Sequence, residues 1–381
     1  MICRTRLRAL SRRLRGRDRR RRKGKERNGR KRTKGQRSAQ SHEIRSVTEH
    51  CLGACTLCIV TLVDPVATPN DHPANRVRRA VGTERLTVLA RLLGRDRDQA
   101  ARFETFAAQE RLTLEHLWGC FDDRGRVEAA ALLSPYPGRT AILTLSTIGK
   151  APEEPAAIET VRAALEEAPM LNLAIVQALL DPRFVSEISV MRRAGFRPLA
   201  TLASMERPLV RSFRSTTTIA SAGRLPAGVA MEGFDDAPES QRALADLLEQ
   251  TYIDTLDCPG LAGLRSTRDV LDGHRRGGRF DPALWTLLRI DGALAGALLL
   301  NETPHLQTME LVYLGLVPSA RGRGLGRLLI DRAIAIAAER RVRSMMLAMD
   351  EENMPAQRLY RAAGFRRLAR RSALVCPIAP R

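Results

Sequence analysis

The sequence contains few lysines, few cysteines and no long apolar segment. Only five of its 381 residues are lysine and none follows Lys150, so the phosphate-binding pattern GxxxxGK[ST] is absent. The seven cysteines are an odd number and most are widely scattered, which argues against a disulfide framework. A reducing compartment is favoured, and we expect a cytoplasmic protein. No apolar run reaches the roughly 18 residues of a membrane-spanning helix.

Positive charge is abundant but concentrated at one end. The formal net charge is +21, and residues 1–45 hold 20 Lys and Arg against 3 Asp and Glu. We expect residues 1–80 to be a basic, disordered extension and linker, because the first 45 residues have almost no apolar side chains to bury. The extension is either a nucleic-acid-binding arm or unselected sequence, such as upstream codons included by a wrong start site. The rest of the chain is nearly balanced in charge.

Three cysteines in this extension, Cys51, Cys55 and Cys58, have the C-x3-C-x2-C spacing found in radical S-adenosylmethionine enzymes. Three thiolates so spaced could hold an iron–sulfur cluster, and His50 beside them also permits a metal-site interpretation. Such an enzyme requires a large β/α barrel downstream, whereas the remaining sequence carries other signals. We therefore expect no metal.

A strand–loop–helix pattern occupies residues 311–340, LVYLGLVPSARGRGLGRLLIDRAIAIAAER. An apolar β-prone run leads through Pro318 into a glycine-rich turn, and a helical pattern follows. Such a turn gathers free N–H groups at the positive end of a helix dipole, which suits a phosphate. The side chains of Arg321 and Arg323 add positive charge. The dinucleotide pattern GxGxxG does not fit, because Arg327 stands at its third glycine.

A second signal follows. Residues 344–349 indicate a buried strand, and residues 353–365, NMPAQRLYRAAGF, a short helix with Pro355 in its first turn and Gly364 as its C-cap. The two motifs, R-x-x-G-x-G and N-x-x-A-x-x-L-Y-x-x-x-G-F, resemble the signature of the GCN5-related N-acetyltransferase (GNAT) family over about residues 228–378. The resemblance implies an α/β (α+β) fold with a mixed, mostly antiparallel central sheet flanked by helices, and acetyl-CoA as co-substrate.

An internal repeat indicates that this unit occurs twice. The matching pairs are Leu117-Trp118 with Leu284-Trp285, and residues 193–197 with residues 362–366. We expect two tandem GNAT-like domains, over residues 81–210 and 211–381. The N-terminal copy is expected to be degenerate, because its counterpart of the glycine turn carries one glycine and two carboxylates, Glu153 and Glu154, which would repel a pyrophosphate.

Periodicity and turn residues predict the elements of both copies. In the first copy they are two helices within residues 84–115, strands at 117–121, 127–133 and 141–145, a helix at 154–166 and a strand at 171–177. In the second copy they are a strand at 228–232, helices at 240–252 and 267–275, strands at 283–290, 293–300 and 308–317, and final strands within 366–377.

Acetyl transfer from a thioester to an amine requires a bound donor, a deprotonated amine, a polarised carbonyl and a proton for the leaving thiolate. The resemblance implies that Tyr360 protonates departing coenzyme A, a task suited to a phenol. Asn353 either binds the pantetheine arm or caps the helix. Glu310 is the candidate base, although strand alternation groups it with Val312 and Leu314 and leaves its orientation open.

Other residues receive lesser roles. Tyr313 is a weaker catalytic candidate that we expect to pack, and His274 and His305 are expected to be solvated in loops. By resemblance, backbone groups at Leu316 and Val317 pair with pantetheine, and an N–H there can polarise the carbonyl. The candidate cofactor-binding residues are Leu316, Val317, Arg321, Gly322, Arg323, Gly324, Leu325, Gly326, Asn353 and Tyr360.

We therefore expect an acyl-CoA-dependent N-acyltransferase that passes an acetyl group directly to a primary amine of a small molecule or peptide. The alternative is a non-catalytic acetyl-CoA-binding regulatory or scaffold protein. No membrane is expected to take part, and nucleic acid only through the basic tail. Asp254, Asp257 and Asp269 would favour a cationic amine, but scattered surface acids explain them equally well.

Overall fold

A computed structural model describes residues 76–109, 112–149, 153–209 and 225–379. The expectations for the basic tail, the three clustered cysteines and most of the connection between the copies lie outside these residues. Among the residues described, no helix is both long and apolar enough to cross a membrane.

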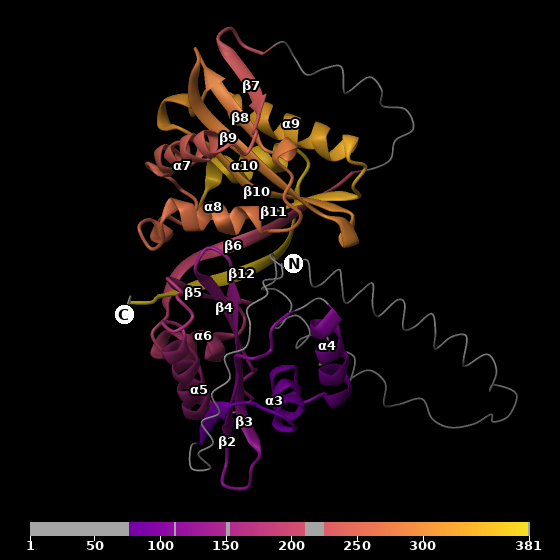
Figure 1. Cartoon of the computed structure of the whole chain (residues 1–381), viewed down its shortest axis with the longest axis vertical. Coiled ribbons are helices and arrows are strands. Elements are labelled where there is room, and N and C mark those ends of the chain that lie inside the picture. The colour runs from indigo at the N-terminus through magenta and orange to yellow at the C-terminus, as the bar shows by residue number, and fades with distance from the viewer. Residues whose placement is uncertain (1–75, 110–111, 150–152, 210–224, 380–381) are drawn as a thin grey trace, which may run out of the picture.

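The described strands form one mixed sheet in the order β1-β2-β3-β4-β5-β12-β6-β11-β10-β9-β8-β7 (Figure 1). In the first half of the chain they are β1 (Val77–Arg79), β2 (Leu117–Phe121), β3 (Val127–Tyr136), β4 (Thr140–Leu145), β5 (Ile175–Leu180) and β6 (Arg197–Pro208). In the second half they are β7 (Val229–Gly233), β8 (Thr286–Ile290), β9 (Ala293–Thr303), β10 (Thr308–Leu316), β11 (Ser344–Asp350) and β12 (Arg366–Pro377).

Helices cover both faces of this sheet, as buried apolar strands such as β3 and β9 require. Figure 1 shows α7 and α9 on either side of β8 and β9. The α-helices are α3 (Glu84–Leu92), α4 (Arg97–Gln109), α5 (Glu154–Glu167), α6 (Val185–Arg193), α7 (Pro238–Tyr252), α8 (Thr267–Arg275), α9 (Leu325–Glu339) and α10 (Met354–Ala362). Short 3₁₀ helices lie at η2 (Pro259–Leu261), η3 (Pro282–Leu284), η4 (Pro304–Leu306) and η5 (Pro318–Ala320).

Counted inward from either edge of the sheet, equivalent strands of the two copies follow in the same order, which confirms the internal repeat. Strands β1 to β5 of the first copy occupy the positions that β7 to β11 occupy in the second. In each copy one parallel pair is present, β4 with β5 and β10 with β11, and each pair is joined at only three positions. Because both copies repeat this register, the tandem arrangement extends to the detail of strand pairing.

The copies exchange their last strands at the centre of the sheet. Strand β6 of the first copy pairs with β11 of the second, and β12 of the second pairs with β5 of the first. Ala203 and Met205 of β6 accordingly belong to the core of the second copy, whereas Leu374 of β12 belongs to the core of the first. Neither core is complete without a strand from the other copy, and the division near residue 210 stays a prediction about the sequence.

Three elements were not anticipated from the sequence. Strand β1 lies inside the segment predicted as linker, and α6 and β6 follow the first copy's parallel strand. The strand expected at residues 171–177 is β5, which begins at Ile175 and ends at Leu180. A single strand, β12, fills the region in which more than one was expected. These elements pair with segments distant in sequence, which local periodicity does not reveal.

Candidate active site

Strands β10 and β11 separate in the middle of the second copy. Thr308, Met309 and Glu310 pair with Ser344, Met345 and Met346, and the ladder stops there. Beyond this point β10 continues beside β9, while β11 continues beside β6. The edge of β10 that faces β11 therefore presents backbone groups with no strand partner among the described residues, and an extended ligand can take that place.

The glycine turn lies at the end of this edge. Gly322 and Gly324 have φ angles of 72° and 78°, a region that residues with a Cβ rarely adopt, and Gly324 is the N-cap of α9. A Cβ at either position would meet no atom within 4 Å. Backbone geometry rather than crowding requires these glycines, and the space above the turn is open. Gly326 differs, because its Cβ would lie 3.3 Å from Leu359 of α10.

The Arg321 side chain is held by backbone carbonyls. Its Nε donates to the carbonyl oxygen of Leu316 at 3.1 Å, and its Nη atoms donate to the carbonyls of Thr251, Ile253 and Asp254 at 3.0, 2.7 and 3.1 Å. These last three carbonyls lie at and just after the C-terminal end of α7, where backbone acceptors lack helical partners. The guanidinium therefore joins α7 to the glycine turn, and the cofactor-binding role of Arg321 stays a prediction.

A β-bulge determines which residues of β10 share a face with Glu310. Glu310 is opposite Asn301 on β9, and Tyr313 is opposite Leu299. Between these two pairs β10 advances by three residues and β9 by only two, so β10 has one extra residue. Asn301 and Leu299 are two apart and share a face, and so therefore do Glu310 and Tyr313. The expected grouping of Glu310 with Val312 is wrong for this reason. Glu310 lies on the face covered by α7 and α8.

Glu310 is almost completely buried. Its exposed fraction is 7%, and its Oε2 has no hydrogen-bond partner among the described residues. Burial disfavours the carboxylate and raises the pKa of Glu310 to about 8. A carboxyl group in this state exchanges its proton near neutral pH, as a general base must.

Tyr360 projects from α10 toward the same region. It is 7% exposed, and its ring packs edge-on against Phe365 at 5.9 Å between centroids. Burial, with smaller effects from Asp257 and Tyr313, raises the pKa of Tyr360, so its phenol stays protonated at neutral pH. Asn353 is the N-cap of this helix, and its Oδ1 accepts a hydrogen bond from the N–H of Ala356 at 3.2 Å. The capping role of Asn353 is thus confirmed.

A polar cluster on the α7–α8 side was only partly anticipated. The Tyr313 hydroxyl lies 2.5 Å from Thr251 Oγ1, and its ring packs near Tyr252 and near His274, the latter at 5.6 Å. Burial raises the pKa of Tyr313 to about 12. Packing, as expected, is therefore a role of this tyrosine.

His274 is not solvated, contrary to expectation. It lies on α8, and its Nε2 is shielded from solvent without a hydrogen-bond partner in the described part of the chain. Burial, helped by the positive charge of Arg265, lowers the pKa of His274 to about 4, so the ring is neutral at pH 7. The side chain of His305 lies outside what the structure describes.

Two carboxylates meet beside the separating strands. The N–H of Asp350 donates to Asp257 Oδ1 at 2.8 Å, and the N–H of Cys258 donates to Asp350 Oδ2 at 3.3 Å. Burial raises the pKa of Asp257; the hydrogen bond from the Asp350 N–H opposes this shift, and the charge of Asp350 adds a smaller effect that raises it. Asp269 instead forms a capping box with Ser266 on α8. Asp350 was not predicted from the sequence as a site residue. Its carboxylate partner, Asp257, lies in the loop after α7 and meets it only in the folded chain.

The first copy lacks the equivalent groups. The parallel registers place Ile142 at the position of Glu310, since Thr140 and Thr308 each begin the three-residue ladder. The N-caps of α6 and α10 are Phe184 and Asn353. From these caps, Met191 takes the position of Tyr360. An isoleucine, a phenylalanine and a methionine cannot act as acid or base.

Comparisons with known proteins agree with this geometry. Residues 248–365 match the model of the Acetyltransferase (GNAT) family. A mycothiol acetyltransferase of Clavibacter michiganensis is 32% identical over 208 residues, which cover 51% of this chain and 63% of the relative. One from Beutenbergia cavernae is 43% identical over 89 residues, 23% of this chain and 29% of the relative. The aligned regions thus span less than two thirds of these curated relatives.

A solved structure supports the same fold. The crystal structure of a GCN5-related N-acetyltransferase from Sphaerobacter thermophilus superposes with a TM-score of 0.54 at 21% identity, covering 80% of this chain and 97% of that one. The class is therefore an α/β protein of GNAT fold. Residues 248–365 of the second copy match the GNAT family model, and the first copy repeats the fold without the candidate base, cap and acid residues.

Proposed function

We propose that the C-terminal copy transfers an acetyl group from acetyl-CoA directly to a primary amine. The observation that carries the proposal is the separation of β10 from β11 after Glu310, with an open glycine turn at one end. Glu310 and Tyr360 lie beside this separation with shifted proton affinities. Such a pair of titratable groups suits proton removal and proton donation.

The donor would be held mainly by backbone. The N–H groups at Gly322, Gly324 and the first turn of α9 form an anion site at the positive end of a helix. The open edge of β10, ending at Leu316 and Val317, would pair with the pantetheine arm as an added strand. Arg323 is exposed beside the turn and can approach a phosphate, whereas Arg321 holds the end of α7.

Two residues of the chain would transfer protons: Glu310 would accept one from the acceptor, and Tyr360 would donate one to the leaving group. Glu310, directly or through water, accepts a proton from the acceptor ammonium, so that the amine nitrogen can attack the thioester carbonyl carbon. A C–N bond forms as the C–S bond breaks, and a backbone N–H of β10 stabilises the transient oxyanion. Tyr360 gives its proton to the departing sulfur and regains one, through solvent, from the nitrogen of the new amide, which loses its second proton as the C–S bond breaks. Glu310 releases the first proton to solvent.

Charge beside the site favours a cationic acceptor. Asp257 and Asp350 place two carboxyl groups next to the tyrosines, and a bound ammonium would relieve their mutual repulsion. Because the relatives are named mycothiol acetyltransferases, amines related to mycothiol are the first acceptors to test.

Calorimetric titration of acetyl-CoA tests donor binding. Wild type should bind one molecule per chain, and Gly324→Glu should abolish binding by placing a carboxylate in the anion site. Gly292→Glu is the matched control, since Gly292 also has a positive φ (83°) and an open Cβ position but lies in the β8–β9 hairpin. Failure of folded wild type to bind would refute the proposal.

Thiol release tests turnover. Free coenzyme A should accumulate only when an amine acceptor is present, and Tyr360→Phe should slow its release. Binding of acetyl-CoA without thiol release across a panel of cationic, neutral and peptide amines would favour the non-catalytic alternative.

A further inference from the structure

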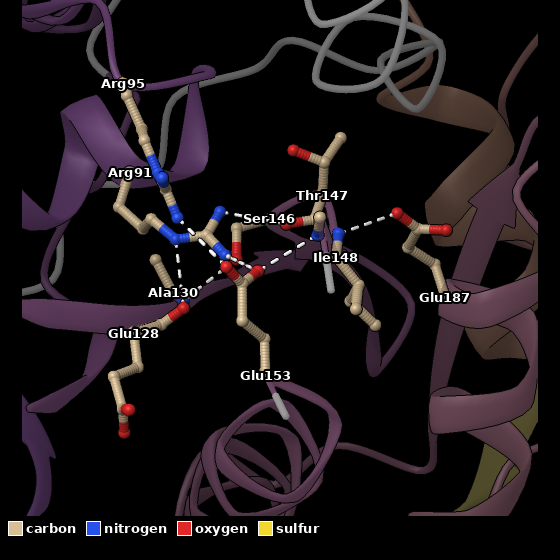
Figure 2. Close-up of polar contacts among 10 residues, drawn as sticks. Arg91, Arg95, Glu128, Ala130, Ser146, Thr147, Ile148, Glu153 and Glu187 are labelled. Carbon is tan, nitrogen blue, oxygen red and sulfur yellow. Dashed lines mark hydrogen bonds and ion pairs between the residues drawn. The ribbon is translucent and has the colours of Figure 1, made fainter. Parts of the chain in front are cut away.

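The first copy places a carboxylate where the second places its glycine turn. Three donors converge on Glu153: Arg91 Nη2 at 2.9 Å, Arg95 Nη2 at 3.1 Å and the N–H of Gly149 at 2.9 Å (Figure 2). Glu153 is the N-cap of α5, the position that Gly324 holds on α9. Two guanidinium groups and a backbone N–H of the loop before α5 form the donor set of an oxyanion site.

Arg91 is fixed in this site by the rest of the copy. Its side chain is 5% exposed, and its remaining nitrogens donate to the carbonyls of Glu128 and Thr147, both at 2.9 Å. Burial lowers the pKa of Arg91 and the charge of Glu153 opposes that shift. A buried guanidinium requires a counter-anion, because an uncompensated charge in the interior is costly.

A second carboxylate lies farther along the same edge. Glu187 of α6 is 4% exposed and accepts a hydrogen bond from the N–H of Ile148 at 2.8 Å (Figure 2). Ile148 follows β4, as Leu316 and Val317 end the edge of β10 that is proposed to hold pantetheine. Both kinds of donor that would hold a cofactor in the second copy are therefore satisfied by side chains in the first.

We propose that the N-terminal copy retains the oxyanion site of the fold and fills it with its own Glu153. The site excludes acyl-CoA, so this copy folds without a ligand, and its glutamate supplies the charge that a phosphate would bring. Without that glutamate, Arg91, Arg95 and the Gly149 N–H accept an external oxyanion such as inorganic phosphate.

Chemical rescue of Glu153→Ala in the full chain tests the proposal. In chloride buffer we expect its Tm to fall by on the order of 5–10 °C, as removal of one partner of a buried ion pair implies. Inorganic phosphate at matched ionic strength should restore much of that loss. The matched control is Glu154→Ala, whose partner Arg193 is exposed, and it should show a small loss without rescue.

The outcomes separate clearly. Rescue that disappears in Glu153→Ala/Arg91→Met supports the proposal, whereas an unchanged Tm in Glu153→Ala, or an equal effect of phosphate on wild type, overturns it. If Glu153→Ala does not fold in either buffer, Glu153→Gln keeps the side-chain volume, and the absence of a phosphate effect there also overturns the proposal. A second acetyl-CoA bound per wild-type chain would do the same. These readouts stand even if the second copy proves to have no activity.

Discussion

Replacement of the buried Glu310 by glutamine should change the pH dependence of stability. Burial raises the pKa of Glu310 from 4.5 to about 8, which corresponds to about 5 kcal/mol at about 1.4 kcal/mol per pH unit. Below pH 4.5 the group is protonated in both folded and unfolded chains, so folding loses nothing. Between pH 4.5 and 8 only the unfolded chain ionises, so wild type loses stability as pH rises. The loss is complete above pH 8.

Glu310→Gln removes this loss, because its amide does not titrate. Relative to wild type, the variant should gain about 4 kcal/mol in unfolding free energy between pH 4.5 and 7.5, as an upper estimate. The amide's own burial cost affects both pH values equally and cancels in that difference. Urea unfolding at several pH values measures it. Glu232→Gln, at an exposed position on β7, is the control and should follow wild type.

Activity should move in the opposite direction. Wild-type kcat/KM should rise with pH through an apparent pKa of about 8, because the base must be deprotonated. Glu310→Gln should lose most of its activity and this limb of the profile. If the variant keeps the wild-type pH dependence of stability, Glu310 does not titrate as described and its assignment as the base loses its foundation.

Three further substitutions probe the site. Tyr360→Phe should lower kcat by about 10²- to 10⁴-fold with little change in acetyl-CoA affinity, and an unchanged kcat would exclude the phenol as proton donor. Arg321→Met removes four backbone contacts and should cost about 2 kcal/mol in urea unfolding while raising the KM of the acceptor; Arg323→Met should leave stability unchanged. Asn353→Ala should cost about 1 kcal/mol, whereas Asn353→Asp keeps a cap. Weaker acetyl-CoA binding in the stable aspartate variant would reveal a ligand contact beyond capping.

The sequence alone determined the features that local chemistry controls. These features are the positive φ angles at Gly322 and Gly324, the cap at Asn353 and the helices that follow each of them. Each depends on a few neighbouring residues, so the sequence pattern was sufficient to predict it. The repeat was visible for the same reason, because each copy needs the same strand, turn and helix signals.

Tertiary structure decided what depends on distant partners. The exchange of β6 and β12 brings together strands far apart in the chain, and the bulge at Val312 places Tyr313 rather than Val312 on the face of Glu310. Arg321 binds carbonyls that lie 67 to 70 residues earlier in the chain. Glu153 was expected only to repel a phosphate, yet in the folded chain its carboxylate accepts a hydrogen bond from Arg91, 62 residues before it. Packing and charge compensation in the folded chain determine which side chains pair. Sequence periodicity reports only local structure, so it does not predict these pairs.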